Sequence, residues 1–575
     1  MKNSIYEPLT TPYESEMNKD TPWADYPRPS LRRESYMTLN GQWDFAIADD
    51  APPEKYSEKI LVPFPPESRL SGIEREIPAG KYLHYERVFT LPEDFSGKKV
   101  ILHIGACDAI CTLFINGKKM AYHEGGYLPI SADITEALRE GENTVYIKAY
   151  DELSHDYPYG KQKRKRGGMW YTPVSGIWQS VWLEAVPYRY IEKIKITTDT
   201  TSAKIEVFGA EEQKRLTLSD GKVYEWAGAC IEIRPDEPKL WSPESPYLYD
   251  FVLESGEDKV ESYFALREIS VMDCSGIPRL ALNGKPYLFN GLLDQGYFPD
   301  GIFLPATSEG YLDDILLTKK MGFNTLRKHI KIEPDIFYYL CDKHGVAVFQ
   351  DMVNNSGYSF ILDTALPTIG PKSLPDKRRH RSRRSREIFV SHSLATVEHL
   401  YSHPSVLYYT VFNEGWGQFC ADENYRLIKA ADPTRIVDAT SGWFVRHESD
   451  VDSRHVYFKP IRLKECGERP VIISEFGGYS YRAPGHLFGK RNYGYKLFNT
   501  EEELCRAVIR LYSEEIYPLI ERGISGLIYT QVSDVEDETN GIVTYDRRHI
   551  KLDAEKIKPI MDKLSSKLSE SANRK

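Results

Sequence analysis

Cysteine is sparse in this chain of 575 residues, and no stretch is long and apolar enough to span a bilayer. The eight cysteines form no Cys-x-x-Cys pair and no cluster with histidine at zinc-binding spacing. These absences argue against a disulfide scaffold and against a closed metal site. The amino terminus lacks the apolar core of a signal peptide. We therefore expect a soluble cytoplasmic protein.

Common catalytic motifs are missing as well. The chain has no Gly-x-Ser-x-Gly, His-Glu-x-x-His, Walker A or Gly-x-Gly-x-x-Gly motif, so a serine hydrolase, a zinc protease or a nucleotide-dependent enzyme has no support. An excess of positive charge is missing too, because 74 Lys and Arg face 84 Asp and Glu, giving a net charge of −10. A mildly acidic chain lacks the positive field that attracts nucleic acid or anionic lipid, so we expect neither nucleic acid nor a membrane as partner.

The composition that remains is that of a globular protein with several domains. Hydrophobic residues make up 41% and charged residues 27% of the chain, and its length predicts three or four domains at about 150 residues each. Tyrosine is abundant, with 39 residues against 23 Phe and 9 Trp. The tyrosine side chain combines a flat apolar face with a hydroxyl group, which suits polar ring-shaped ligands and interfaces.

The first third of the chain has the pattern of short β-strands. Apolar and polar residues alternate in YLHYERVFTL, KVILHIGA, CTLFING and NTVYIKAYD, and these runs end at turn residues. Asn116-Gly117 is a strong hairpin signal, because both residue types tolerate positive φ. We expect a jelly-roll sandwich over residues 1–187. A second series of short strands predicts a small immunoglobulin-like sandwich over residues 188–273.

The pattern changes after Leu282, where short apolar runs alternate with helical stretches. Eight such runs follow one another: YLFNGLL, FNTLRKHI, VAVFQDM, VLYYTVFNE, RIVDAT, RHVYF, VIISEF and GLIYTQVSD. Alternation of this kind predicts a (β/α)8 TIM barrel over residues 274–575. Six runs turn polar at their carboxyl ends, where a barrel presents its chemistry: Arg327 and His329, Asp351, Asn413 and Glu414, Asp438, Glu475, and Gln531 with Asp534.

Two glutamates end strands that we count as the fourth and the seventh of this barrel. Glu414 follows VLYYTVFN and Glu475 follows VIIS, so both side chains are expected at the top of the barrel. Two facing carboxylates, one a neutral acid and one an ionised nucleophile, are the machinery of glycoside hydrolysis. The structural alternative is that each glutamate binds an arginine or a lysine on the barrel rim.

Several motifs resemble glycoside hydrolase family 2 over nearly the whole chain. VFNEGWG resembles the acid/base signature of that family, and IISEFGG resembles its nucleophile signature. RPSLRRESYMTLNGQWDF, MWYTPVSGIWQSVWLE and FALREISVMDCSGIPRLALNGKPYLFNG resemble its sugar-binding domain, domain junction and start of the barrel. The predicted order of jelly roll, immunoglobulin-like sandwich and barrel is also the order of the family.

The resemblance implies a role for each matching residue. Glu414 would be the general acid/base and Glu475 the nucleophile, while Asn413 would bind the sugar 2-hydroxyl. Arg327 would pair with the nucleophile and keep it ionised. Three further side chains would line or orient the site: His455, Tyr457 and Tyr479.

Other polar and aromatic residues near the predicted strand ends are candidates for touching the sugar. Each of them has a structural alternative, either a hydrogen bond within the fold or packing in the core: His329, Asp351, Asp294, Trp416, Trp443 and Gln531. The basic run between Arg378 and Arg386 reads as a solvated loop leading into a helix. A nucleic-acid role for that run would require steeply salt-dependent binding.

The resemblance implies a retaining exo-β-glycosidase, and we favour a β-galactoside as its substrate. β-Glucuronidases of the family carry an Asn-x-Lys motif near the eighth strand, but no lysine lies two residues after Asn540. Ser-Glu-Phe-Gly is closer to β-mannosidases, so β-mannosidase and β-glucuronidase activity stay as alternatives. A non-catalytic carbohydrate-binding protein is the alternative of another class. The implied chemistry needs no cofactor and no metal, and the resemblance leaves a homo-oligomer open.

Overall fold

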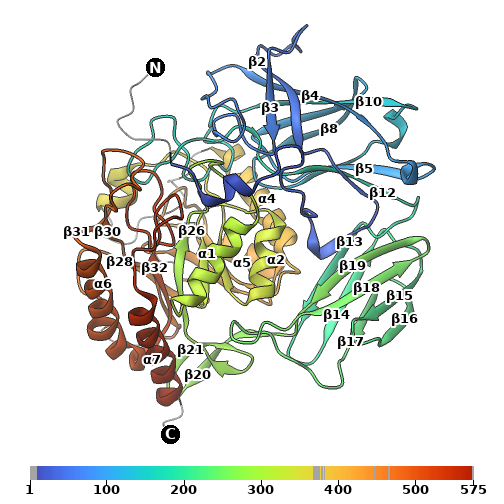
Figure 1. The fold of residues 1–575 in the computed structure, drawn as a ribbon. Helices are drawn as coiled ribbons and strands as arrows, with labels where there is room; N and C mark the ends of the chain where they lie inside the picture. Colours follow the sequence, from blue (N-terminus) through green and yellow to red (C-terminus); the bar gives the residue numbers. More distant parts are fainter. Residues whose placement is uncertain are drawn as a thin grey trace.

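The computed structural model describes residues 9–572, except 367–375, 377–379, 381, 445–446 and 464–466. Figure 1 shows a helix-covered barrel beside two β-sandwiches, the N-terminal one above the smaller second one. The predicted order of jelly-roll sandwich, immunoglobulin-like sandwich and barrel is confirmed.

The first sandwich packs a six-stranded sheet against a four-stranded sheet. The larger sheet has the order β3 (Glu58–Val62), β2 (Gly41–Ala48), β4 (Tyr82–Thr90), β10 (Glu142–Tyr150), β7 (Ile110–Ile115) and β8 (Lys118–Glu124). The smaller sheet has the order β1 (Tyr36–Thr38), β12 (Val181–Val186), β5 (Lys99–Ile104) and β9 (Ile130–Asp133). Every second residue of β10 is buried, because alternate side chains point into the space between the sheets.

The predicted turn at Asn116-Gly117 joins β7 to β8 as an antiparallel hairpin. Asn116 has φ 50° and Gly117 has φ 80°, so both residues adopt the left-handed conformation that favours these two residue types. This hairpin prediction is confirmed.

The second sandwich has seven strands in two sheets, as in constant-type immunoglobulin domains. One sheet contains β13 (Lys193–Thr198), β14 (Ala203–Phe208) and β17 (Cys230–Ile233). The other has the order β16 (Val223–Ala227), β15 (Gln213–Leu218), β18 (Tyr249–Ser255) and β19 (Asp258–Phe264).

A buried ion cluster ties the two sandwiches together. The Arg33 guanidinium lies 2.9 Å from Glu184 of β12 and donates two hydrogen bonds, 3.1 and 2.9 Å long, to Asp258 of β19. A hydrogen bond of 3.1 Å connects Arg28 to Glu184 as well. Because these charged groups are removed from water, each of them is stable only while its partners of opposite charge are present.

The barrel contains eight parallel strands, and each of them coincides with one of the eight predicted runs. In chain order they are β23 (Phe289–Asp294), β24 (Thr325–Lys328), β25 (Ala347–Asp351), β26 (Val406–Asn413), β27 (Ile436–Ser441), β28 (Asp452–Val456), β29 (Val471–Gly477) and β32 (Ile524–Thr530). The hydrogen-bonded order of the strands begins at β27, continues through β23 and β32 and ends at β28, so the barrel is nearly closed. β26 is the fourth strand and β29 the seventh, as expected.

Helices follow most of the barrel strands. Their bounds are α1 (Glu309–Lys320), α2 (Asp335–His344), α4 (Arg383–Leu400), α5 (Ala421–Ala431), α6 (Glu501–Arg510) and α7 (Ala554–Ala572). Among the described residues, none follows β27 or β28. The helical stretch expected over residues 500–523 divides into α6, a π-helical turn η7 (Leu511–Ile516) and a 3-10 helix η8 (Tyr517–Arg522). Pro518, near the start of η8, lacks the N–H that a continuous α-helix would need there.

A small antiparallel sheet closes the amino-terminal end of the barrel. It consists of β20 (Ile269–Cys274), β21 (Ile277–Leu282) and β22 (Lys285–Pro286), and it lies below the barrel in Figure 1. Arg279 of β21 donates a hydrogen bond of 2.8 Å to the carbonyl oxygen of Ile524 at the start of β32. The carboxyl ends of the strands are therefore the end available for chemistry.

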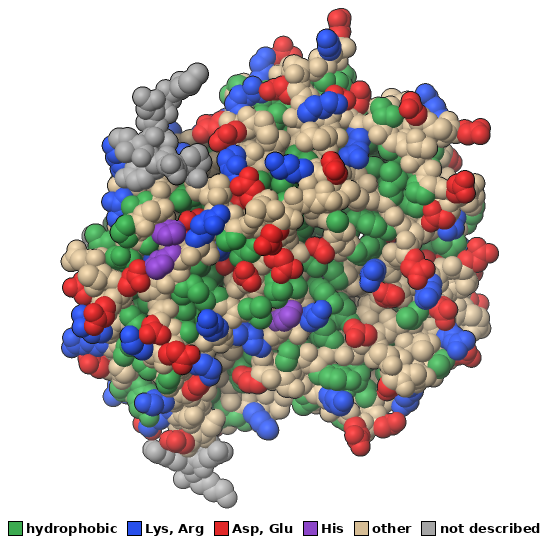
Figure 2. Space-filling view, viewed as in Figure 1, with side chains coloured by type: hydrophobic (Ala, Val, Ile, Leu, Met, Phe, Trp, Pro, Cys, Tyr) green, Lys and Arg blue, Asp and Glu red, His purple; other side chains and the backbone are tan. Residues whose placement is uncertain are grey.

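The described surface carries both signs of charge. In Figure 2, basic and acidic side chains are interspersed over the face shown. No helix in the described part of the chain is long and apolar enough to cross a membrane.

Of the predicted basic loop, Arg378 lies outside the described residues. Arg384, in the first turn of α4, donates a hydrogen bond of 3.0 Å to the Tyr157 hydroxyl of the first sandwich.

Replacing Arg33 by Met should destabilise the junction of the two sandwiches. The change leaves Glu184 and Asp258 buried without their shared cation, a loss of about 3–5 kcal/mol. Arg32→Met is the matched control, because the ion pair of Arg32 with Glu261 is exposed and contributes no more than about 1 kcal/mol. Urea unfolding followed by tryptophan fluorescence measures both variants. Equal unfolding midpoints for the two variants would contradict the role of Arg33.

Candidate active site

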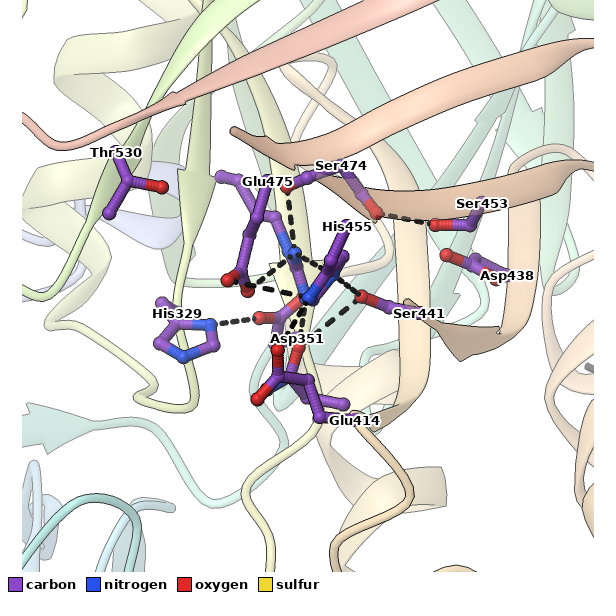
Figure 3. A network of polar contacts seen from close by, with 12 residues as sticks. His329, Asp351, Glu414, Asp438, Ser441, Ser453, His455, Ser474, Glu475 and Thr530 are labelled. Carbon is purple, nitrogen blue, oxygen red and sulfur yellow. Dashed lines mark hydrogen bonds and ion pairs between the residues drawn. The ribbon is translucent and has the colours of Figure 1, made fainter. Parts of the chain in front are cut away.

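The predicted polar strand ends meet at the carboxyl-terminal end of the barrel. Figure 3 shows side chains from six strands and from the residues just after them pointing toward one another: His329, Asp351, Glu414, Ser441, His455 and Glu475. Asp438 lies apart from this group, beside Ser453 in the same view. The convergence follows from the parallel barrel, in which every strand delivers its last residues to the same end.

Glu475, in β29, is held by three neighbouring groups. The Tyr457 hydroxyl donates a hydrogen bond of 2.8 Å to its carboxylate, and Arg327 donates one of 3.1 Å. The Nδ1 atom of His455 lies 3.4 Å from the same carboxylate. Burial alone would raise the pKa of Glu475, but the positive charges of His455 and Arg327 outweigh burial and lower that pKa to about 2. Glu475 is therefore an ionised carboxylate at neutral pH.

Arg327, in β24, is the buried cation at the centre of the site. Besides Glu475, its guanidinium donates hydrogen bonds of 2.9 Å to Asp351, to the Asn413 side-chain oxygen and to the carbonyl oxygen of Ser474. Because the Asn413 oxygen accepts from Arg327, its amide NH2 group remains to donate to a ligand. The planar guanidinium of β24 thus fixes the orientation of three other strand ends at once, those of β25, β26 and β29.

Glu414 directly follows β26 and has a φ of 52°. Positive φ is uncommon for glutamate, and strained backbone of this kind persists where the surrounding structure fixes it. Here the Glu414 N–H donates a hydrogen bond of 3.0 Å to the Ser441 carbonyl oxygen at the end of β27. The Glu414 side chain is 17% exposed, against 7% for Glu475, so it is the more open of the two carboxylates.

The two carboxylates are close together. One carboxylate oxygen of Glu414, one of Glu475 and one ring nitrogen of His455 all lie within 4.8 Å of one another. Retaining glycosidases place their carboxyl groups about 5–5.5 Å apart, whereas inverting enzymes need about 6.5–9.5 Å for an intervening water. The spacing observed here is on the retaining side.

His455 connects the two carboxylates. Its Nδ1 atom lies 2.8 Å from Glu414, and its Nε2 atom lies 2.6 Å from the Ser441 hydroxyl. Because the ionised carboxylate of Glu475 only accepts hydrogen bonds, Nδ1 carries a proton, while Nε2 pairs with the Ser441 hydroxyl. Ser441 therefore fixes the orientation of the His455 ring.

Of the remaining predicted residues, two contact side chains of the site, and the others are held by partners elsewhere in the fold. His329 binds Asp351 at 2.7 Å, and burial and the charge of Lys161 lower its pKa to about 4, so it is a neutral imidazole beside the site. Trp443 is partly exposed and packs edge-on against His455, with ring centroids 5.7 Å apart. Both residues thus contact the polar network around the two carboxylates.

Four other candidates have structural partners. Asp294, the last residue of β23, pairs with Lys328 at 2.7 Å and is buried. The buried indole of Trp416 donates a hydrogen bond of 3.0 Å to the Ser356 carbonyl oxygen.

Gln531 is also buried, and its side-chain NH2 group donates hydrogen bonds of 2.9 Å to Glu538 and to Asn540. Tyr479, in β30 (Tyr479–Tyr481), packs against Phe498 at a centroid distance of 5.3 Å, and no described contact joins it to Glu475.

The sequence did not identify several residues that face the two carboxylates. Tyr495 stacks on Tyr457 with ring centroids 3.7 Å apart, and burial together with the charges of Glu414 and Glu475 raises the pKa of its hydroxyl. The charge of Lys161, in the first sandwich, helps to lower the pKa of Glu475, and the charge of Glu475 adds to the burial that raises the pKa of Glu538, in the loop after β32. None of these residues ends a barrel strand, so the strand-end pattern gave no signal for them.

Models of one family match most of the chain. The model of the Glycosyl hydrolases family 2 sugar binding domain matches residues 71–187, a model described as Glycosyl hydrolases family 2 matches residues 188–267, and the model of the family's TIM barrel domain matches residues 278–551. The chain belongs to glycoside hydrolase family 2. The last of these matches contains both Glu414 and Glu475.

Curated relatives of this family 2 chain are β-galactosidases of greater length. Those of Halalkalibacterium halodurans and Priestia megaterium are 23% and 22% identical, over 70% and 79% of this chain. The β-galactosidase of Leuconostoc mesenteroides is 26% identical over 72% of this chain. The matched regions cover 41%, 49% and 41% of these relatives, so the chain spans less than half of their length.

Solved structures with the same fold cover nearly all of the chain. A β-D-glucuronidase from Dictyoglomus thermophilum has a TM-score of 0.73 at 19% identity, covering 93% of this chain and 98% of that one. A family 2 β-galacturonidase from Eisenbergiella tayi has a TM-score of 0.67 at 19% identity, covering 93% and 98%. At this identity the likeness shows the fold that the family 2 chain shares with them.

The pH dependence of catalysis should depend on Arg327. The family resemblance assigns Glu475 as the nucleophile, which must be ionised to attack, so activity should be lost as the pH falls through the pKa of Glu475. Arg327→Met removes a charge that lowers this pKa, so the acid limb of kcat/KM should move up by about 1–3 pH units. Arg327→Lys retains the charge without the planar fork, and its acid limb should stay closer to that of the wild type. Identical acid limbs in the two variants would contradict this electrostatic role.

Proposed function

We propose that the protein is a retaining exo-β-glycosidase that removes a terminal β-linked sugar through two displacements. The observation that supports this most is the close pair Glu414 and Glu475 in unlike environments. Glu475 has a lowered pKa, whereas Glu414 is more exposed and lacks a direct contact with Arg327 among the described interactions. Two carboxyl groups with separate roles are what the retaining mechanism requires.

In the first displacement, Glu475 attacks the anomeric carbon and forms a covalent glycosyl ester. Glu414 gives its proton to the glycosidic oxygen as the bond to the leaving group breaks. In the second displacement, Glu414 takes a proton from water while the water oxygen attacks the anomeric carbon, and Glu475 leaves as a carboxylate. Two inversions give net retention of configuration.

Neighbouring groups support the charges of this cycle. The Asn413 NH2 group, left free by the bond between its oxygen and Arg327, is suited to donate to a sugar hydroxyl close to Glu475. Tyr457 donates to the Glu475 carboxylate before attack and after release of the sugar. His455, near both carboxylates, donates to whichever of them carries more negative charge.

A β-galactoside is the substrate we propose. The curated relatives are β-galactosidases, and their matches include the barrel that carries both glutamates. A β-glucuronide or β-galacturonide is the second candidate, because enzymes with those names share the fold and Lys161 brings a positive charge to the site. A β-mannoside is the third candidate, as predicted from the Ser-Glu-Phe-Gly motif.

Hydrolysis of nitrophenyl α- and β-glycosides tests the proposal. The panel contains galactoside, glucoside, mannoside, glucuronide, galacturonide, fucoside and arabinoside, with Glu475→Gln as the blank. Release from β-glycosides only, absent from the variant, is expected. If the wild type binds sugars on an affinity column but hydrolyses none of the panel, a non-catalytic carbohydrate-binding protein is supported instead.

Azide should separate the roles of the two glutamates. In Glu475→Ala the small anion replaces the nucleophile and should give an α-glycosyl azide of inverted configuration. In Glu414→Ala azide should attack the covalent intermediate and give the β-glycosyl azide. NMR of the products distinguishes the two anomers. The opposite pairing of variant and anomer would exchange the two assignments.

Loss of the acid should depend on the leaving group. Glu414→Ala should slow alkyl β-glycosides by about 10²–10⁴-fold, because these leaving groups need a proton to depart. Dinitrophenyl glycosides have a leaving group that is already stable as an anion, so the rate of their first displacement should fall far less. Glu414→Gln, which preserves shape, is the matched control for kcat/KM. Equal losses for both substrate classes would argue against Glu414 as the acid.

A further inference from the structure

A cavity of about 430 Å³ lies where the two sandwiches meet the barrel. Its walls come from all three domains, and the barrel contributes helices α2 and α4, which Figure 1 shows on the side that faces the sandwiches. None of its lining residues belongs to the group around Glu414 and Glu475. A volume of this size is within the range of about 300–1,000 Å³ that small-molecule sites have.

Most of the surface inside this cavity is apolar. Trp182 of β12 comes from the first sandwich and Ile196 of β13 from the second, while Ile336 of α2 and Ala395 of α4 come from the barrel. A ligand that fills the cavity would therefore bury an apolar face against residues of three domains.

Hydrogen bonds and an ion pair hold the walls of the cavity together. The Ile196 N–H donates a hydrogen bond of 3.1 Å to the Ser402 hydroxyl just after α4, and Lys193 of β13 pairs with Glu398 of α4. On the other side, the Trp23 indole donates one of 3.1 Å to the Pro305 carbonyl oxygen of the barrel. The cavity thus belongs to the docked arrangement of the domains.

His103, in β5, presents a buried nitrogen without a partner in this cavity. The side chain stacks on Trp182 with ring centroids 4.8 Å apart, and its Nδ1 atom lies 2.7 Å from the Ser131 hydroxyl. Within the described part of the chain, its Nε2 atom makes no hydrogen bond, and Glu184 lies 3.8 Å away, beyond hydrogen-bond length. His103 is 5% exposed, and burial lowers its pKa to about 3, so the ring is neutral.

A hydroxyl group suits this nitrogen in either tautomer. In a neutral imidazole one nitrogen donates and the other accepts, so the role of Nε2 is opposite to the role that Nδ1 takes toward Ser131. A hydroxyl can donate or accept and therefore pairs with Nε2 in both cases. A carboxylate can only accept and an ammonium can only donate, and a buried ion needs a counter-charge that neutral His103 does not supply.

Two further polar groups that line the cavity lack partners among the described residues. The Nε atom of Arg28 is buried without a hydrogen bond, while its NH2 atom is held 3.0 Å from Glu184. The side-chain amide of Gln179, which is 7% exposed, makes no hydrogen bond to another described residue. A few polar groups in an apolar wall suit a ligand with one or two oxygens, whereas the many hydroxyls of a monosaccharide would be left largely unpaired.

We propose that this cavity binds a neutral aromatic alcohol, with its ring against the apolar wall and its hydroxyl at the Nε2 atom of His103. The site is separate from the proposed glycosidase centre, because no residue of the cavity takes part in the displacement steps. An occupant that contacts three domains binds only their docked arrangement, so it should also raise the unfolding midpoint of the protein.

The test compares phenol with toluene, which has a methyl group in place of the hydroxyl. Isothermal titration calorimetry of the full chain should show that phenol binds about five- to tenfold more tightly than toluene, the difference expected for one hydrogen bond. His103→Phe retains a flat ring without nitrogen atoms and should lower the affinity for phenol to that for toluene. Ser131 is exposed and can bond to water in this variant. Benzoate and benzylammonium should bind at least about tenfold more weakly than phenol.

A matched pair of tryptophan variants on α4 tests the place of binding. Ala395→Trp fills the cavity and should abolish the binding of phenol and of toluene. Ser391→Trp adds the same indole at an exposed position of the helix and should bind both as the wild type does. Far-UV circular dichroism shows whether each variant is folded, and His103→Phe decides the proposal if Ala395→Trp is not.

The contrary outcomes are distinct. Equal affinity of the wild type for phenol and toluene, or an affinity for phenol unchanged in His103→Phe, overturns the proposal. Phenol binding that persists in a folded Ala395→Trp places the ligand elsewhere and overturns it as well. Binding of free galactose that is stronger than binding of phenol and is lost in Ala395→Trp overturns the ligand class. Hydrolysis of the glycoside panel is measured without phenol, so failure of either proposal leaves the other standing.

Discussion

The carboxyl-terminal end of the barrel depends on one buried cation, the Arg327 guanidinium. It is 1% exposed and donates to Asp351, Asn413, Glu475 and the backbone of Ser474, so it joins the ends of four strands. A buried charge of this kind is tolerated only when its hydrogen bonds are complete. The same bonds that stabilise the cation therefore keep Glu475 as an anion and leave the Asn413 NH2 group free for a ligand.

The second carboxylate has a different environment because it lies just beyond a strand end. Glu414 has positive φ, binds the backbone of β27 through its N–H and contacts His455 rather than Arg327. One glutamate lies against the cation and the other at the more open side, so two chemically identical groups have different surroundings. His455, whose ring is oriented by Ser441, lies beside both carboxylates, and its charge helps to lower the pKa of Glu475.

Much of this arrangement was predictable from local patterns. The eight apolar runs became the eight barrel strands, and Asn116-Gly117 formed the expected hairpin, because strand burial and turn geometry depend on residues close in sequence. The polar ends of the runs indicated the chemical face, since parallel strands deliver their carboxyl ends to one side. The roles of Asp294 and Trp416 were not predictable, because whether a polar or aromatic side chain turns inward depends on partners from distant segments.

The sequence by itself determined the strand periodicity, the domain order and the two glutamates at the ends of the fourth and seventh strands. Only the tertiary structure decided which groups act on these glutamates, because Lys161, Tyr495 and Glu538 lie in loops outside the strand pattern. Their positions depend on contacts such as Gly160 against Ile330 and Thr172 against Glu536, which join residues far apart in the chain. Strand patterns report local burial, whereas a pocket is formed by the closing of a barrel and the docking of a neighbouring domain.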